Sequence, residues 1–161
     1  MGQHSARVTW EIGDGDFPRK RYSRAHRWTF DGGLSVPASA SPHIVSAPYS
    51  DPNGIDPEEA FVASLSSCHM LCFLARAAQA GFIAESYEDD AEGTLEKNAE
   101  GRLSITRVTL SPAVRFSGEK LPSQEEIEHL HHLAHEDCFI ANSVKTDIVC
   151  TPRIAAERQA A

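Results

Sequence analysis

Residues 56–81 read DPEEAFVASLSSCHMLCFLARAAQAG, and this stretch predicts the central element of the fold. Asp56 supplies a capping carboxylate, and Pro57 suits the first position of a helix. Two glutamates follow in the first turn, where the helix dipole stabilises negative charge. Gly81 stands where a helix commonly ends. We therefore expect one helix that begins at Pro57 and ends by Gly81.

Apolar residues occupy nearly every face of this expected helix. Phe61, Leu65 and Cys68 follow one another at helical spacing, and the other faces carry further apolar side chains: Val62, Met70, Leu71, Phe73 and Leu74. The uncharged part, residues 60–75, contains serines and a histidine, and it is too short and too polar for a bilayer core of about 30 Å. A helix that is apolar all round belongs at the centre of a fold or at an interface. We expect a buried helix and no contact with a membrane.

Strand patterns precede and follow the helix. Three short strands are expected before it, over residues 7–12, 22–30 and 34–39, because Gly-Asp turns separate alternating stretches. After the helix, residues 86–95 and 102–117 flank a turn and predict a hairpin. The phase of the apolar alternation changes within the second strand, which predicts a bulge between Ile105 and Val108.

A second helix and a last strand complete the expected order. Ser123 and Glu126 form the pattern of a capping box, which predicts a helix over residues 124–135. A closing strand is expected over residues 146–154, followed by a frayed tail over Ala155–Ala161. Strands and helices in this order indicate an α+β fold rather than an alternating parallel one, in a single domain over residues 1–161.

The composition limits the classes of partner. Lys and Arg total 15 against 23 Asp and Glu, for a formal charge of −8. Such an acidic chain lacks the electrostatic attraction to phosphate on which most nucleic-acid binding rests, so neither DNA nor RNA is expected as a partner. The first residues carry no apolar secretory core, so we expect a cytoplasmic location, where the four cysteines stay reduced unless they do redox or metal chemistry.

A cysteine becomes a catalyst when its pKa is lowered and substrate reaches it, whereas a buried thiol without such help is a small hydrophobic residue. Cys68 lies in the middle of the first helix, so the helix N-terminus does not activate it directly. Cys138 follows the second helix, 70 residues later, and meets Cys68 only through tertiary packing. Cys72, one turn after Cys68, is either a second thiol near the site or an inert core residue, and we favour the inert residue. Cys150 is interpreted as structural.

At these residues the chain resembles the OsmC/Ohr family of thiol-dependent peroxidases, over about residues 7 to 153. The resemblance rests on three motifs: Asp56-Pro57-Glu58-Glu59, Ser67-Cys68 ten residues after Glu58, and Ala134-His135 with Cys138 ahead of Asn142-Ser143. Ser67-Cys68-His69-Met70 is closer to the OsmC-like branch. The resemblance implies antiparallel sheets, a long central helix, a second helix and an intertwined homodimer.

The resemblance also implies a peroxidatic cysteine at Cys68 and a resolving cysteine at Cys138. A thiolate attacks the peroxide, leaving an alcohol and a sulfenic acid, and the second thiol condenses with that acid to a disulfide. Organic hydroperoxides are the expected substrates because the residues around Cys68 are apolar: Phe61, Leu65, Met70, Leu71 and Phe139. No bound cofactor is expected, and a lipoyl group or a small thiol is implied as the external reductant.

Members of the family also use an arginine ahead of the Asp-Gly turn and the glutamate of the helix cap. Glu58 matches the glutamate, while Arg21, Arg24 and Arg27 all precede the turn. Arg24 is preferred for its seven-residue spacing to Asp31. A guanidinium near Cys68 would stabilise the thiolate, and the Glu58 carboxylate would orient the guanidinium.

A dimer also follows from helix geometry. Glu58 and Cys68 lie ten residues apart, which is about 15 Å along a continuous helix. One chain does not easily bring both side chains to one sulfur, so we expect the site to be completed across a pair of these helices in a homodimer.

The histidines of the second helix support an alternative function. His131 and His135 share a helix face with Cys138 one turn further, and His129 and His132 lie nearby. Zinc or copper uses such spacing, so the alternative is a metal- or small-ligand-binding stress protein without peroxidase activity. The pattern has no fixed fourth ligand, so we favour a solvated polar face as its explanation. His69 is interpreted as a packed histidine rather than a base.

Overall fold

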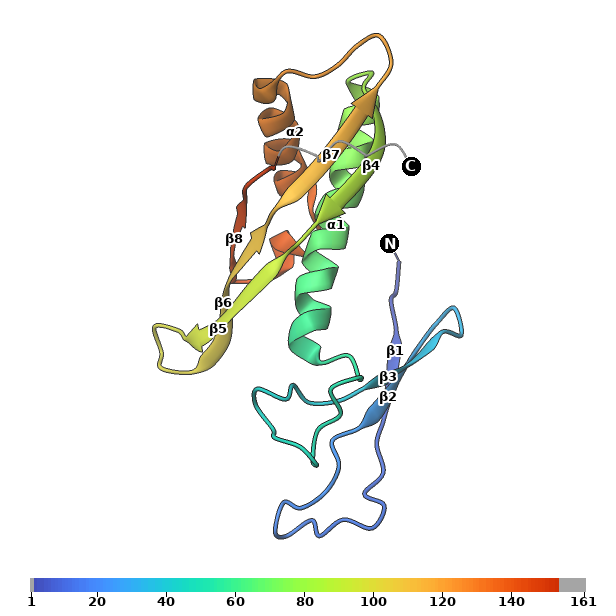
Figure 1. Ribbon diagram of the computed structural model, residues 1–161, viewed down its shortest axis with the longest axis vertical. Coiled ribbons are helices and arrows are strands. Elements are labelled where there is room, and N and C mark those ends of the chain that lie inside the picture. The colour runs from blue at the N-terminus through green and yellow to red at the C-terminus, as the bar shows by residue number, and fades with distance from the viewer. Residues whose placement is uncertain (1, 154–161) are drawn as a thin grey trace, which may run out of the picture. The chain divides into compact units, whose positions relative to one another are not determined.

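In the computed structural model, which describes residues 2–153, the stretch 56–81 forms one continuous helix, α1 (Pro57–Gln79), as expected (Figure 1). Asp56 and Glu59 cap it reciprocally: the Glu59 amide donates to Asp56 Oδ1 (2.8 Å) and the Asp56 amide donates to Glu59 Oε2 (3.2 Å). At the other end Gly81 adopts a left-handed backbone (φ +80°), and the Phe82 amide donates to the Ala77 carbonyl. Glycine suits this helix end because it has no Cβ to clash.

Helix α1 is buried along one stripe only. Leu65, His69, Phe73 and Ala77 are buried at intervals of four residues, whereas the Leu71 side chain is 61% exposed. The expectation of burial on all sides is therefore wrong for the single chain. By length and composition alone α1 is also long and apolar enough to cross a membrane, because it continues past the uncharged residues 60–75. Its buried stripe packs against protein, as a core helix does.

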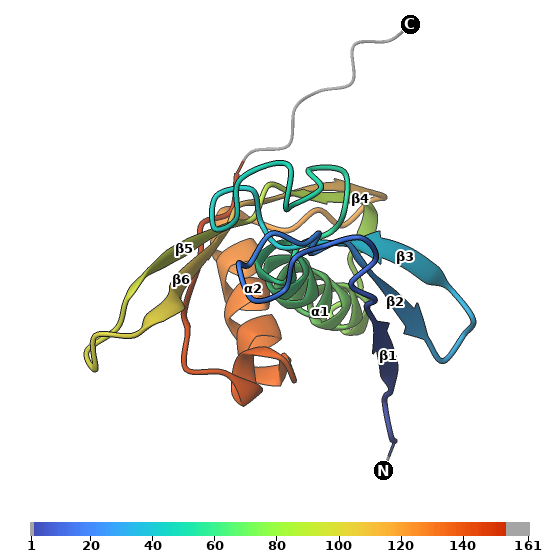
Figure 2. The same cartoon turned by 90° about the horizontal axis from the view of Figure 1, so that it is seen from below.

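The chain divides into two units, Met1–Ala60 and Phe61–Ala161. The first unit contains a three-stranded antiparallel sheet in the order β1-β2-β3, visible in Figure 2. Its strands are shorter than predicted and span Ala6–Thr9, His26–Phe30 and Ser35–Ala38. The segment before β2 is a loop, so Arg24, which the prediction placed in a strand over residues 22–30, lies outside β2.

The second unit has four strands where the sequence predicted two long ones. They are β4 (Ile83–Asp89), β5 (Glu92–Lys97), β6 (Leu103–Leu110) and β7 (Pro112–Ser117). Strand β4 pairs with β7 and β5 pairs with β6, both antiparallel. The two predicted long strands are interrupted after Asp89 and at Ser111, which face each other. The Ser111 amide donates to the Asp89 carboxylate at 2.6 Å instead of continuing the strand pairing.

The hairpin of β5 and β6 contains the predicted bulge. Thr94 pairs with Arg107 but Leu95 pairs with Ile105, so Thr106 is an extra residue without a direct partner. This residue lies between Ile105 and Val108, where the phase of the alternation changes, and it confirms the prediction.

Helix α2 (Gln124–Asp137) begins with the predicted capping box of Ser123 and Glu126. A short 3₁₀ helix, η1 (Ala141–Ser143), leads to β8 (Asp147–Cys150), which pairs with β6 in parallel and is the exception to the antiparallel pattern. The expected tail over Ala155–Ala161, with residue 154 of the expected strand, lies outside the described residues.

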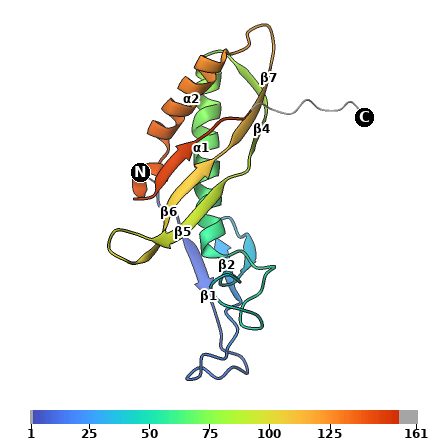
Figure 3. The ribbon, with the colours of Figure 1, turned by 60° about the vertical axis from the view of Figure 1, so that its left-hand side comes forward.

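The core of the second unit joins the two helices to β4 and β7. Phe73 and Ala77 of α1 pack with Leu130 and Ala134 of α2, and Phe116 of β7 covers them. The helices run side by side against these strands (Figures 1 and 3). The end of α2 is thereby held beside the middle of α1, which carries Cys68.

Candidate active site

The structure brings Cys68 and Cys138 together. Cys68 is a half-buried residue of α1, and Cys138 is the C-cap of α2, with its side chain 1% exposed. Each thiol lies close enough to the other to shift its pKa, and both are free. Two free thiols on different elements that meet in this way are what a disulfide between those elements requires.

The backbone after α2 determines the charge state of Cys68. Burial alone would raise the pKa of the Cys68 thiol, but hydrogen bonds from the Ile140 amide, the Cys138 thiol and the Phe139 amide outweigh it. The pKa therefore lies below its ordinary value. Amide groups that point at one sulfur stabilise the thiolate, which is the nucleophilic form.

Cys138 has the opposite tendency. Burial and the neighbouring Cys68 together raise the pKa of its thiol to about 11, although the Ala141 amide donates to its Sγ at 3.4 Å. At neutral pH the pair therefore holds one activated sulfur and one protonated sulfur.

Side chains of the second unit fix the loop that carries these amides. The Arg76 guanidinium of α1 donates to both carboxylate oxygens of Asp137, at 2.6 and 3.0 Å. The Asn142 side-chain amide donates to the carbonyls of Glu136 (2.8 Å) and Cys138 (3.0 Å). These bonds hold the Cys138 end of α2 in one position relative to α1.

Cys72 contacts the same site. It follows Cys68 by one helical turn. Burial and the neighbouring Cys68 raise the pKa of the Cys72 thiol. The thiol is therefore kept protonated close to Cys68, and whether it is inert in the chemistry stays a prediction.

Arg24 and Glu58 belong to the first unit, and no ion pair among the described residues joins them. Arg24 is half-buried while Arg21 and Arg27 are exposed. Its Nη1 donates to the carbonyls of Lys20 (3.0 Å) and Tyr22 (2.6 Å), and its guanidinium lies 3.9 Å from the centre of the Tyr22 ring. Glu58 Oε2 is buried and accepts no hydrogen bond.

Comparison with known proteins identifies the family. The family model described as OsmC-like protein matches residues 50–153, which include Glu58, Cys68 and Cys138. The chain belongs to the OsmC-like family. No protein with a curated description matches it.

Solved structures of OsmC-like proteins share the fold of this family member. An OsmC-like protein of unknown function from Vibrio cholerae is 54% identical, with a TM-score of 0.92 over 95% of this chain and 100% of that chain. An organic hydroperoxide resistance protein from Elizabethkingia anophelis is 16% identical, with a TM-score of 0.70 over 98% of each chain. The organic hydroperoxide resistance protein OhrB of Bacillus subtilis is 23% identical, with a TM-score of 0.66 over 92% of this chain and 98% of that one.

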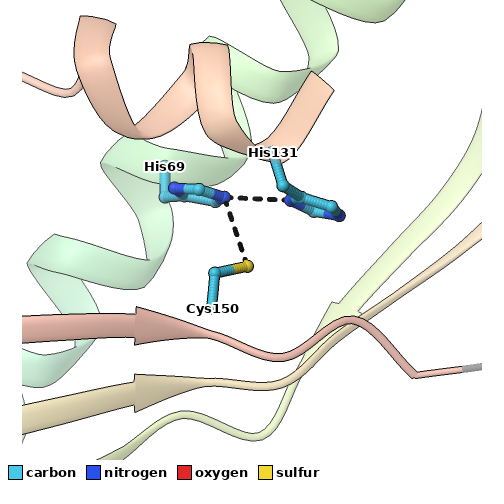
Figure 4. A group of neighbouring side chains, drawn as sticks. All are labelled: His69, His131 and Cys150. Carbon is cyan, nitrogen blue, oxygen red and sulfur yellow. Dashed lines mark hydrogen bonds between the residues drawn. The ribbon is translucent and has the colours of Figure 1, made fainter. Parts of the chain in front are cut away.

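The histidines of this OsmC-like protein do not form the predicted ligand set. His129, His132 and His135 are exposed on α2, whereas His131 is buried and contacts His69 of α1 rather than His135 or Cys138. Within residues 2–153, His69, His131 and Cys150 are the one group of three or more such side chains with donor atoms close enough to share a metal ion (Figure 4). The interpretation of a solvated face is wrong for His131, while His69 is packed as expected. Sequence spacing gave no signal for this group because its members lie on three separate elements.

Proposed function

We propose that this OsmC-like protein is a thiol-dependent hydroperoxide reductase that acts in oxidative stress defence. The observation that carries the proposal is the pair of Cys68, whose pKa is lowered by backbone amides, and the buried Cys138 that contacts it. A nucleophilic thiolate beside a second thiol is the minimal equipment for reducing a peroxide through a disulfide.

The reaction proceeds in two steps. The Cys68 thiolate attacks the terminal oxygen of ROOH, the O–O bond breaks, and the RO⁻ that leaves takes a proton to become ROH while Cys68 becomes a sulfenic acid. The Cys138 sulfur then attacks the Cys68 sulfur, hydroxide leaves with the Cys138 proton as water, and a Cys68–Cys138 disulfide forms. Cys138 begins the cycle protonated, which supplies that proton.

An external dithiol restores the two thiols. A lipoyl group or a small thiol attacks the disulfide and takes the two oxidising equivalents, so no bound cofactor takes part. We place this cycle in the cytoplasm, where a reducing thiol pool exists.

Organic hydroperoxides are the proposed substrates. The Phe139 side chain is 78% exposed beside Cys138, and Leu71, one turn after Cys68, is also exposed. These apolar surfaces gain more from contact with an organic R group than from hydrogen peroxide. Proteins named for organic hydroperoxide resistance have the same fold, which supports the choice.

Arg24 and Glu58 complete the proposal. Arg24 serves the thiolate and the leaving oxygen, and Glu58, whose buried Oε2 accepts no hydrogen bond, orients the guanidinium. Since α1 is continuous, Glu58 and Cys68 are separated by about 15 Å along its axis. We therefore propose a homodimer as the active unit, and an active monomer in sedimentation at micromolar concentration would contradict it.

The proposal is tested by thiol titration before and after one equivalent of cumene hydroperoxide. Wild type loses two thiols and peptide mapping finds the Cys68–Cys138 disulfide. Cys68→Ser consumes no peroxide, and Cys138→Ser reacts once and leaves a sulfenic acid that a dimedone-type reagent traps. Equal peroxide consumption by wild type and Cys68→Ser refutes the assignment.

A further inference from the structure

Three side chains of residue types that commonly bind metals come from distant parts of the chain and meet inside the second unit. His69 comes from α1, His131 from α2 and Cys150 from β8, as Figure 4 shows. His69 Nε2 lies 3.0 Å from His131 Nδ1 and 3.7 Å from Cys150 Sγ, and the three donor atoms all lie within 4.8 Å of one another. Cys68, the next residue to His69, lies on another face of α1 and contacts Cys138 instead.

Protein contacts leave this group incompletely satisfied. The His69 and His131 side chains are 1% and 3% exposed, and neither His69 Nδ1 nor His131 Nε2 has a hydrogen-bond partner. Within residues 2–153 the hydrogen-bond partners of the two rings are each other and the Cys150 thiol, and no carboxylate bonds to either ring.

Two neutral imidazoles share one proton between the facing nitrogens. Whichever ring donates it, one outer N–H and one outer lone pair remain buried without a partner. Burying such groups costs free energy, and native proteins rarely do so without a reason. A cation bound by both facing nitrogens would use both of their lone pairs, so no proton would be needed between them. Each outer nitrogen would then carry an N–H group, so the ion changes the demand at the facing nitrogens and does not itself satisfy the outer ones.

We propose that His69 Nε2, His131 Nδ1 and Cys150 Sγ bind one divalent ion of the zinc class. Zinc binds histidine nitrogen at about 2.0–2.1 Å and cysteine sulfur at about 2.3 Å, so a tetrahedral site separates two nitrogens by about 3.3 Å and a nitrogen from a sulfur by about 3.5 Å. The separations of 3.0 and 3.7 Å lie within a few tenths of an ångström of these values. Three protein ligands leave the fourth position to water.

The surroundings favour a cation and give it access. A pocket of about 270 Å³ is lined by His131 and Cys150 together with Glu128, His132 and His135, and it offers a route for the ion and room for water. One Zn²⁺ ion bound by one thiolate and two neutral imidazoles leaves the site with a net charge of about +1. The Asp89 carboxylate accepts a hydrogen bond from Ser66, which lies one turn before His69 on α1, so a negative charge that favours a positive ion lies near the group.

The first test leaves the proposed ligands untouched. The chain has four cysteines, so Cys68→Ser, Cys72→Ser and Cys138→Ser combined leave Cys150 as the sole thiol. We expect this variant to bind one Co²⁺ per chain with a thiolate-to-cobalt charge-transfer band, and to bind Zn²⁺ in competition with a chromophoric chelator. A folded variant without that band overturns the proposal.

The second test removes a ligand from the otherwise wild-type, reduced chain. Cys150→Ser should lower the affinity for Zn²⁺ by about 100-fold or more, since even the loss of a residue that only supports a ligand costs 10–100-fold. His129→Ala, which removes an exposed histidine of the same helix outside that pocket, should bind as wild type does. Unchanged binding in Cys150→Ser, or uptake of copper without zinc or cobalt, overturns the proposal. The peroxidase pair plays no part in either readout, so this proposal and the peroxidase proposal fail independently.

Discussion

The Arg76 guanidinium of α1 forms a bidentate salt bridge with the Asp137 carboxylate of α2, with hydrogen bonds of 2.6 and 3.0 Å, and this Arg76–Asp137 fork lies one residue before Cys138. Both side chains are more than a third exposed, so the fork contributes little to the free energy of unfolding. Its position matters more than its strength, because it fixes the resolving cysteine against the helix that carries Cys68.

Replacing Arg76 should therefore slow the proposed chemistry more than it destabilises the fold. We expect Arg76→Gln to form the Cys68–Cys138 disulfide roughly tenfold more slowly after a stoichiometric hydroperoxide, since small displacements of reacting groups cost large rate factors. Quenched alkylation followed by mass spectrometry measures the rate. Arg115→Gln is the matched control, because Arg115 pairs with Glu85 between β7 and β4. Equal rates in both variants would show that the fork does not position Cys138.

The same fork predicts a pH dependence of stability. The hydrogen bond from Arg76 holds the pKa of Asp137 below its usual range. A folded-state pKa below the unfolded one contributes stability that is present above the unfolded value, about 4, and is lost as pH falls through the folded value. The difference in unfolding free energy between wild type and Asp137→Asn should thus shrink as pH falls from 5 to about 3. Urea denaturation at several pH values measures it, and a constant difference would contradict the argument.

Phe139 should set the preference among peroxides. Its backbone amide stabilises the Cys68 thiolate, while its exposed side chain is free to contact substrate. Phe139→Ala keeps the amide, so kcat/KM for cumene hydroperoxide should fall roughly tenfold while that for hydrogen peroxide changes little. Phe139→Leu should restore most of the loss. An equal fall for both peroxides would place the effect on the thiolate instead.

Gly93 of β5 marks a close approach to α1. A Cβ added at this residue would lie 2.6 Å from Val62 Cγ2, far inside contact distance. Gly93→Ala should therefore lower the free energy of unfolding by about 1–3 kcal/mol. Thermal or urea unfolding measures this loss, and adding Val62→Ala should recover part of it. No recovery would mean that the strain arises elsewhere.

Sequence signals predicted the elements whose determinants are local. Asp56 and Glu59 cap α1 reciprocally, Ser123 and Glu126 do the same for α2, and the change of phase before Val108 marks the bulge at Thr106. Each signal lies within a few residues of the feature that it predicts. The break between β6 and β7 at Ser111 was not predicted, because the Ser111 amide bonds to the carboxylate of Asp89, a residue 22 positions earlier in the chain.

The candidate site was less accessible to sequence reasoning. The pairing of Cys68 with Cys138 was expected only from the family resemblance, since nothing in the spacing brings them together. Backbone amides have no signature in the sequence, so the hydrogen bonds from Phe139 and Ile140 to Cys68 could not be foreseen. His131 was grouped with exposed histidines because its polarity gives no sign that α1 and β8 would bury it.

Helix α1 presents Cys68 and His69 to different neighbours from adjacent positions, because successive side chains diverge by about 100° around a helix. The same turn of α1 therefore positions Cys68 relative to Cys138 and His69 relative to His131 and Cys150. A rotation of α1 about its axis that withdrew the Cys68 sulfur from the amides after α2 would also turn the His69 ring away from His131 and Cys150. The geometry of the thiol pair and that of the histidine cluster therefore both depend on the rotational position of α1.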